Sequence, residues 1–267
     1  MIQARALSLV GLLASIALAL VTPVDVRPAH STYQATHPTN AAKIFRWGNA
    51  AWNDEFVRPL SATTWQVNPS GQVRNQHGML TLNATPRSRD VTASVIGHDQ
   101  QYGRWEARVR TRGYRAGNGA SGTPYRAVWE LVPSRGGYGC GARSIVLSDY
   151  PIGGAAAAMH VRNTPDADFT ASKALPLRNT FHTYAVEVTP DHVSWFVDTE
   201  VVMTERRPAA LSGATFTARF RLVSTPGATM RTGRMQMDWV RYYSLARPNA
   251  HSITAPQAAR TTYDDAC

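Results

Sequence analysis

The sequence predicts an all-β protein whose main domain is a two-sheet antiparallel β-sandwich of the jelly-roll kind. Short stretches alternate apolar and polar residues with a period of two, as strands with one buried face do. Turn residues separate these stretches, and no convincing amphipathic helix follows the N-terminal segment. The chain has 267 residues, 43% of them hydrophobic. That suffices for one sandwich domain, since such domains commonly reach about 200–250 residues.

The expected strands lie between residues 47 and 243. The stretch 104–110 is the clearest of them, because Trp105, Ala107 and Val109 alternate with charged residues and therefore share one face. Stretches of similar character follow along the chain at residues 78–82, 183–188, 193–197 and 218–223. Many short strands joined by regular turns favour a sandwich or jelly roll over other all-β architectures.

The first 29 residues, with an approximate end, are predicted to be a signal peptide. Arg5 provides a positive start, and residues 6–21 are largely apolar. This stretch is shorter than the roughly 20 residues of a membrane span but suits the apolar region of a signal peptide. An uncleaved N-terminal anchor is the alternative, and no second apolar stretch of spanning length follows. We therefore expect a secreted protein, extracellular or associated with the cell wall, without a transmembrane segment in its mature form.

The rest of the chain divides into three expected parts. Residues 30–45 are expected to be a flexible leader, residues 46–245 the jelly-roll domain, and residues 246–267 a C-terminal tail. Cys140 and Cys267 are the only cysteines. In an oxidising compartment an isolated pair predicts a disulfide, which would tie the tail back to the domain and stabilise it by about 4–5 kcal/mol.

The chain is strongly basic, with a formal net charge of +10. All but two of its 28 basic residues are arginine. This balance favours anionic partners such as an acidic polymer. The arginines are scattered and form no Lys/Arg-rich run, so we expect no nucleic-acid binding. A solvated basic surface is the alternative explanation.

Eight sequence blocks follow one another along the chain between residues 52 and 243. The blocks are residues 52–56 (WNDEF), 65–67 (WQV), 78–82 (GMLTL), 102–109 (YGRWEARV), 127–131 (AVWEL), 181–187 (FHTYAVE), 195–198 (WFVD) and 235–243 (MQMDWVRYY). Each block alone is a weak signal. Their sequential order over about residues 52–243 resembles glycoside hydrolase family 16, the family of laminarinases, lichenases and agarases, and this order makes the resemblance specific.

The resemblance implies a concave sheet that forms an open glycan cleft, so the expected partner is a polysaccharide. The excess of arginine favours an anionic polysaccharide over a neutral one. Sugar rings stack on aromatic side chains. Trp129 is the first candidate for the cleft, and Trp105 and His160 are further candidates, although a core position is the more common role for each tryptophan. No cofactor is expected for chemistry. The resemblance also implies a structural calcium near Asp238, whose alternative role is to pair with Arg241.

Active members of that family carry Glu-x-Asp-x-x-Glu on one strand. The first Glu is the nucleophile, the Asp assists it, and the last Glu is the general acid/base. Retaining hydrolysis needs two carboxyl groups about 5–5.5 Å apart, one ionised and one protonated. Positions one and three share a face through strand alternation, whereas position six reaches that face only through a β-bulge.

The matching stretch of this chain is residues 144–149 (SIVLSD). Ser144 then takes the nucleophile position, Val146 the assisting position, and Asp149 the acid/base position. Only Asp149 retains a carboxylate, so the two-carboxylate mechanism is not expected. Glu130 is the alternative carboxylate: it either lies opposite Asp149 as a relocated catalytic group or pairs with an arginine such as Arg143 or Arg126.

Three functions follow from these observations. The first is a polysaccharide-binding protein of the family 16 type without retaining hydrolysis. The second is a divergent glycosidase or transglycosylase that uses Asp149 with Glu130. The third is a structural exported protein that kept only the sandwich. A Ser-His-Asp esterase using Ser144 or Ser148 is the weakest alternative, because neither serine lies in the G-x-S-x-G elbow that such esterases use.

Overall fold

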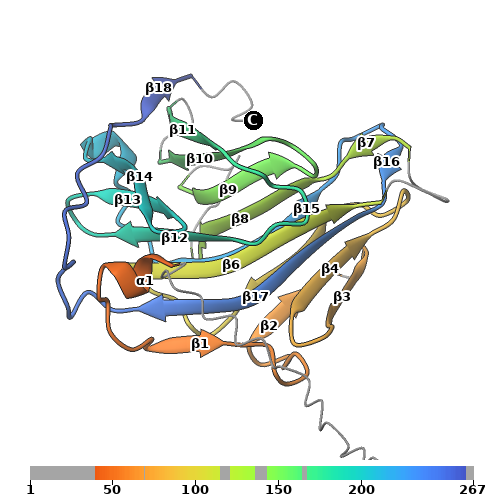
Figure 1. The fold of residues 1–267 in the computed structure, drawn as a ribbon, viewed down its shortest axis with the longest axis horizontal. Coiled ribbons are helices and arrows are strands. Elements are labelled where there is room, and N and C mark those ends of the chain that lie inside the picture. The colour runs from red at the N-terminus through yellow and green to blue at the C-terminus, as the bar shows by residue number, and fades with distance from the viewer. Residues whose placement is uncertain (1–39, 69, 115–120, 136–142, 164–166, 263–267) are drawn as a thin grey trace, which may run out of the picture. The chain divides into compact units, whose positions relative to one another are not determined.

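The computed structural model describes residues 40–68, 70–114, 121–135, 143–163 and 167–262. Within these ranges the chain forms two eight-stranded antiparallel sheets (Figure 1). A two-stranded parallel pair, β7 (Thr123–Pro124) with β16 (Met230–Arg231), adds to them. The described helices are α1 (Ala41–Ile44) and a short 3-10 helix at Pro208–Ala210. The predicted all-β sandwich is confirmed.

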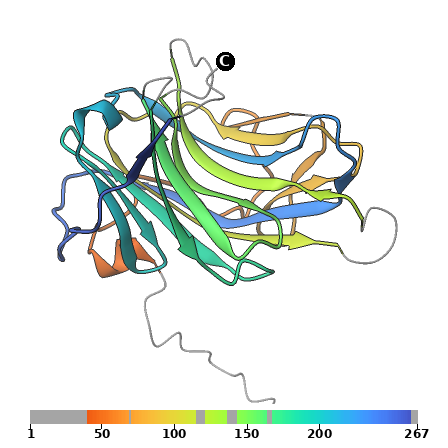
Figure 2. The same ribbon diagram turned by 90° about the horizontal axis from the view of Figure 1, so that it is seen from above.

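We call the two large sheets A and B. Sheet A has the order β14-β13-β12-β6-β17-β4-β3, with β1 paired to β17, and sheet B has the order β18-β11-β10-β9-β8-β15-β5-β2. The strands of sheet A are β1 (Trp52–Asp54), β3 (Gln72–Asn75), β4 (Leu80–Ala84), β6 (Gly103–Gly113), β12 (His182–Val188), β13 (Val193–Val197), β14 (Glu200–Glu205) and β17 (Gly233–Tyr243). Those of sheet B are β2 (Trp65–Val67), β5 (Val91–Val95), β8 (Arg126–Pro133), β9 (Ile145–Pro151), β10 (Ala156–Arg162), β11 (Asp168–Ala174), β15 (Phe216–Val223) and β18 (Ala259–Thr261). The long strands of both sheets are visibly curved in Figure 2.

The inner faces of the two sheets form one hydrophobic core. Sheet A contributes the alternating residues of β6, among them Trp105 and Val109, and sheet B contributes Trp129 and Phe220. The rings of Trp129 and Phe220 stack with their centroids 5.5 Å apart. Burial of apolar surface at roughly 25 cal/mol per Å² makes this core the main stabilising contribution to the fold. The period-two pattern of the sequence is thus the pattern of core and outer face.

The end of the expected flexible leader is instead folded onto the outer face of sheet A. Ala41 is fully buried and Ala42 nearly so, as part of a second cluster that includes Phe45. The backbone N–H of Ala42 donates to Glu106, which lies on β6 and is fully buried. A carboxylate at a helix N-terminus satisfies backbone donors that the helix itself leaves unpaired. The leader prediction is therefore wrong for residues 40–45.

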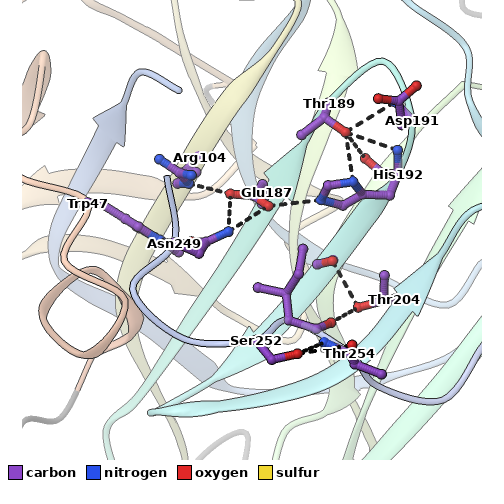
Figure 3. Close-up of polar contacts among 12 residues, drawn as sticks. Trp47, Arg104, Glu187, Thr189, Asp191, His192, Thr204, Asn249, Ser252 and Thr254 are labelled. Carbon is purple, nitrogen blue, oxygen red and sulfur yellow. Dashed lines mark hydrogen bonds and ion pairs between the residues drawn. The ribbon is translucent and has the colours of Figure 1, made fainter. Parts of the chain in front are cut away.

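The described part of the C-terminal tail is also packed against the domain (Figure 3). Glu187 on β12 accepts hydrogen bonds from Asn249, at 2.9 and 3.0 Å, and from Arg104 and His192. The indole nitrogen of Trp47 donates to Asn249 at 2.6 Å. These contacts join the segment after β17 to both the N-terminal segment and sheet A. Beyond them, β18 pairs with β11, so residues 246–262 form part of the fold.

Two expectations fall outside the described residues. Cys140 and Cys267 lie in ranges that the structure does not describe, and so does the expected signal peptide at residues 1–29. Among the helices that are described, none has the length and apolar character needed to cross a membrane. The disulfide and the signal peptide stay predictions.

Candidate functional site

Strand β9 contains a β-bulge at the place where the sequence predicts the catalytic stretch. Glu130 on β8 pairs with Val146, and its neighbour Trp129 pairs with Ser148, so Leu147 is the extra residue. The register between β9 and β10 shifts at the same point. An extra residue changes the alternation of a strand. The bulge therefore brings Asp149 to the same face as Val146, as the expected motif requires.

This outer face of sheet B holds a cavity of about 260 Å³. Its lining includes Ser144, Val146 and Asp149, together with the two further candidates Glu130 and His160. The other lining residues are Arg126, Val128, Arg162, Arg221 and Val223. The three motif positions and the two separately proposed residues, Glu130 and His160, thus lie in one place.

Asp149 is held by an arginine of the neighbouring strand. Arg126 Nε donates to Asp149 Oδ1 at 2.9 Å, and Arg126 Nη2 donates to the other carboxylate oxygen. This is the two-pronged geometry in which guanidinium matches carboxylate best. The Asp149 side chain is 11% exposed, whereas that of Arg126 is 53% exposed. The carboxylate therefore lies in the cavity wall with both oxygens engaged.

Glu130 is buried and is engaged by two arginines of β15. Arg219 Nη2 lies 2.8 Å from Glu130 Oε1, and Arg221 Nη1 lies 3.2 Å from the same atom. A buried charge is tolerable only when it is paired and hydrogen-bonded, and these contacts provide both. The expectation that an arginine pairs with Glu130 is confirmed, but the partners are not the expected Arg143 or Arg126. Arg126 pairs with Asp149 instead. Arg219 and Arg221 lie about 90 residues further on and are brought to Glu130 by strand pairing.

His160 belongs to a third charged group in the same wall. Its Nδ1 lies 3.3 Å from Asp168 Oδ2, and Arg162 Nη2 donates to the same oxygen at 3.0 Å. Burial acts to raise the pKa of Asp168, but the hydrogen bond from His160 and the charge of Arg162 outweigh it and lower that pKa. His160 thus has the carboxylate partner that orients a histidine, a contact that could not be predicted from the sequence alone.

The two tryptophans expected at the cleft are core residues, so both predictions are wrong. Trp129 is fully buried against Phe220, and Trp105 is 2% exposed and packs against Tyr242 at 5.1 Å between ring centroids. Both lie at alternate positions that face the opposite sheet. The sequence showed that they lie on strands but did not show which face each strand turns inward.

Trp195 has a role that the sequence did not indicate. It lies on β13 of sheet A, is fully buried, and its indole nitrogen donates to the carbonyl oxygen of Val146 at 2.9 Å. Val146 is the residue next to the bulge, where regular pairing is interrupted. The bond therefore links the opposite sheet to the bulge and helps to fix the position of Val146 in the cavity wall.

Asp238 lies at a register shift in β17, on the outer face of sheet A. Arg108 Nη1 donates to its carboxylate at 2.7 Å, whereas Arg241 pairs with Glu55 at 2.8 Å. In the described ranges no group of three or more His, Cys, Asp or Glu side chains could hold a metal ion. Asp238 alone does not fit a calcium ion, which takes 6–8 oxygen ligands. Calcium near Asp238 stays a prediction that rests on the resemblance.

Known proteins resemble this chain in sequence and in fold. No protein-family model matches the chain. The endo-1,3-1,4-beta-glycanase ExsH of Rhizobium meliloti (strain 1021) is 24% identical over 220 residues, which are 78% of this chain and 46% of that protein. The chain thus spans about half the length of this relative.

Solved structures give a closer view of the fold. A mutant of SCLam, a non-specific endo-beta-1,3(4)-glucanase from glycoside hydrolase family 16, aligns with a TM-score of 0.61 at 17% identity, covering 73% of this chain and 94% of that one. The catalytic domain of an endo-1,3-beta-glucanase (laminarinase) from Thermotoga petrophila aligns with a TM-score of 0.61 at 13% identity, covering 74% and 98%. The chain has the jelly-roll fold of glycoside hydrolase family 16.

The cavity side chains do not meet the requirements of the retaining hydrolysis that family 16 enzymes carry out. That reaction needs one carboxylate free to attack and one carboxylic acid free to give a proton. Ser144 and Val146 provide neither group. The carboxylates of Asp149 and Glu130 both accept hydrogen bonds from arginines. What the cavity offers a ligand is arginine N–H groups, the His160 ring and three valine side chains, an arrangement suited to binding polar groups.

Proposed function

We propose that the chain is an exported polysaccharide-binding protein of the family 16 type that does not carry out retaining hydrolysis. The observation that carries this proposal is the face of the bulged strand β9. This strand, with the residue directly before it, presents Ser144, Val146 and Asp149 to one cavity, and Arg126 engages the only carboxylate among them. Export rests on the expected signal peptide at residues 1–29.

The relatives support a polysaccharide as the ligand. ExsH is described as a glycanase, and the aligned solved structures are glucanases. The cavity of this chain lies on the strand that the family resemblance identifies as catalytic. Its polar lining, with Arg126 more than half exposed, can donate hydrogen bonds to sugar hydroxyl or carboxylate groups. The ligand would therefore bind along the outer face of sheet B.

Affinity electrophoresis or a glycan array with the purified protein tests this proposal. Arg126→Ala should weaken binding of any retained polysaccharide without lowering the melting temperature by more than a few degrees, since its side chain is half exposed. Arg206→Ala is the matched control, because Arg206 is exposed and lies outside the cavity lining.

The expected result is binding that Arg126→Ala weakens and the control preserves, with oligosaccharides recovered at unchanged length. Binding unaffected by Arg126→Ala would contradict the location of the site. Absence of binding to every neutral and acidic polysaccharide offered would contradict the function and favour a structural role.

A second function is favoured by one specific observation. Asp149 and Glu130 line the same cavity, as the divergent-glycosidase alternative requires. Asp149 pairs with Val128, two residues from Glu130 on the same strand, which makes the two carboxylates diagonal neighbours on one face. Diagonal positions are separated by about 7–8 Å. Hydrolysis that is lost in both Asp149→Asn and Glu130→Gln would establish this alternative.

A further inference from the structure

The open part of the outer face of sheet A carries five arginines, which we call the arginine grid: Arg74, Arg108, Arg110, Arg112 and Arg234. Strand register arranges four of them in two parallel rows. The first row runs Arg74–Thr81–Gln236–Arg110 across β3, β4, β17 and β6, and the second runs Gln72–Asn83–Arg234–Arg112 across the same strands. Arg108 follows on β6, two residues from Arg110. The grid is thus a regular pattern of guanidinium groups separated by amide and hydroxyl side chains.

The grid has little compensating negative charge. Among the described contacts, the ion pair of the grid with an acidic side chain is the one between Arg108 and Asp238. The other two hydrogen-bonded arginines have uncharged partners: Arg110 Nε donates to Gln236 at 3.0 Å, and Arg234 Nε donates to Asn83 at 2.7 Å. Arg112 and Arg234 lie directly opposite each other on neighbouring strands. Like charges in that position destabilise a sheet, and a bound anion would remove this cost.

Two aromatic rings hold the guanidinium groups in place. Arg108 and Arg110 both lie over the ring of Phe181, with their Cζ atoms 4.4 and 4.5 Å from its centroid. Arg112 and Arg234 share the ring of Tyr114 in the same way, each at 5.7 Å. Stacking of this kind is favourable for arginine and restricts its rotamers. These four arginines of the grid are therefore held in place before any ligand binds.

The charges on the rest of this face are arranged differently. Toward the other end of β6, Glu106 is covered by the segment around α1, and Arg104 pairs with the buried Glu187. At the grid, in contrast, Arg74 and Arg112 are exposed. The face is thus divided into a covered part whose charges are internally compensated and an open part with a surplus of positive charge.

We propose that the arginine grid binds an acidic polysaccharide, at a surface separate from the cavity on sheet B. Alternate residues along β6 are about 7 Å apart, and the rows span about 14 Å across four strands. A site of this extent matches a polymer with repeated acidic groups better than a single small anion. Guanidinium groups bind carboxylates in a two-pronged geometry, and the intervening amide and hydroxyl groups can bind sugar hydroxyls.

A nucleic acid fits the same surface less well. Single strands bind by stacking bases on aromatic rings, but the rings of Phe181 and Tyr114 are already covered by guanidinium groups. Among the described residues, this face also has no protruding helix or ribbon of the kind that enters a duplex groove. An acidic polysaccharide needs only the charges and the hydrogen bonds.

Binding of the full-length protein to polygalacturonate, measured over a series of salt concentrations, tests the proposal. The double variant Arg112→Gln/Arg234→Gln should bind at least about tenfold more weakly and show a shallower salt dependence. The double variant Arg206→Gln/Arg260→Gln removes the same charge from exposed positions outside the grid and should bind as the unmodified protein does. Circular dichroism should show all three folded.

Equal affinity of the grid variant and the unmodified protein would overturn the proposal, and so would an equal loss in the control. Laminarin and single-stranded DNA are measured in parallel. Binding of single-stranded DNA as tight as that of polygalacturonate, with the same loss in the grid variant, would assign the surface to nucleic acid and overturn the proposal as well. Because none of these variants touches the cavity lining, failure here is distinguishable from failure of the function proposed for sheet B.

Discussion

Replacing Glu130 by Gln tests directly whether this carboxylate stabilises the fold through its ion pairs or is available for catalysis. The Glu130 side chain is 5% exposed, and Arg219 and Arg221, its partners, are 20% and 25% exposed. Breaking a fully buried ion pair costs about 3–5 kcal/mol. Because both arginines keep some solvent contact and Arg221 also pairs with Asp90, we expect a loss of about 2 kcal/mol in the free energy of unfolding.

Urea denaturation provides the assay, with the midpoint shifted and the slope unchanged. Asp149→Asn is the matched control, because its partner Arg126 is 53% exposed and the expected loss is only about 0–1 kcal/mol. A loss in Glu130→Gln that does not exceed the loss in the control would refute the reasoning. It would mean that the buried ion pairs contribute nothing to stability and that Glu130 is available for another role.

Four further predictions concern other parts of the molecule. Burial raises the pKa of Glu106 from an ordinary value near 4.5 to about 7. The contribution of Glu106 to stability should therefore be greatest below pH 4.5 and fall by about 3 kcal/mol as pH rises from 4.5 to 7; Glu106→Gln should remove this part of the pH profile, and an unchanged slope over that range would contradict the assignment. Trp129→Ala should destabilise the protein by about 3–5 kcal/mol because it empties a core position, and a near-neutral change in the melting temperature would show that the residue is not in the core. Thiol titration of the unfolded, non-reduced protein should find no free thiol from Cys140 and Cys267, whereas two reactive thiols would rule out the disulfide. For Asp238, a chelator that leaves the melting temperature unchanged, together with no calcium by elemental analysis, would end the calcium prediction.

The strands, and the division of each strand into two faces, were predictable because period-two alternation is a local property of the sequence. The bulge in β9 was predictable only through the family resemblance, since residues 144–149 contain no turn residue that signals it. Trp129 and Trp105 were placed in the cleft because alternation shows that two faces exist but not which one meets the other sheet. The covering of Glu106 by residues 40–42 depends on a contact over 64 residues, which composition cannot reveal.

The partners of the cavity carboxylates were missed for a related reason. Arg219 is 89 residues from Glu130 and reaches it only through the pairing of β15 with β8. Asp168 reaches His160 through the hairpin of β10 and β11. The regular pattern of the arginine grid likewise exists only in the register of four strands. In a sequence with 28 basic residues, these arginines look like any others.

The central claim is that the cavity on sheet B binds polysaccharide without retaining hydrolysis. The measurement that tests it most directly is product release from laminarin, lichenan, agarose, xyloglucan and acidic polysaccharides by the unmodified protein. We expect no product above background, because neither Ser144 nor Val146 can ionise and Asp149 is engaged by Arg126. Reproducible turnover that is abolished by Asp149→Ala or Glu130→Ala, in variants that remain folded, would contradict the claim and establish a relocated pair of carboxylates.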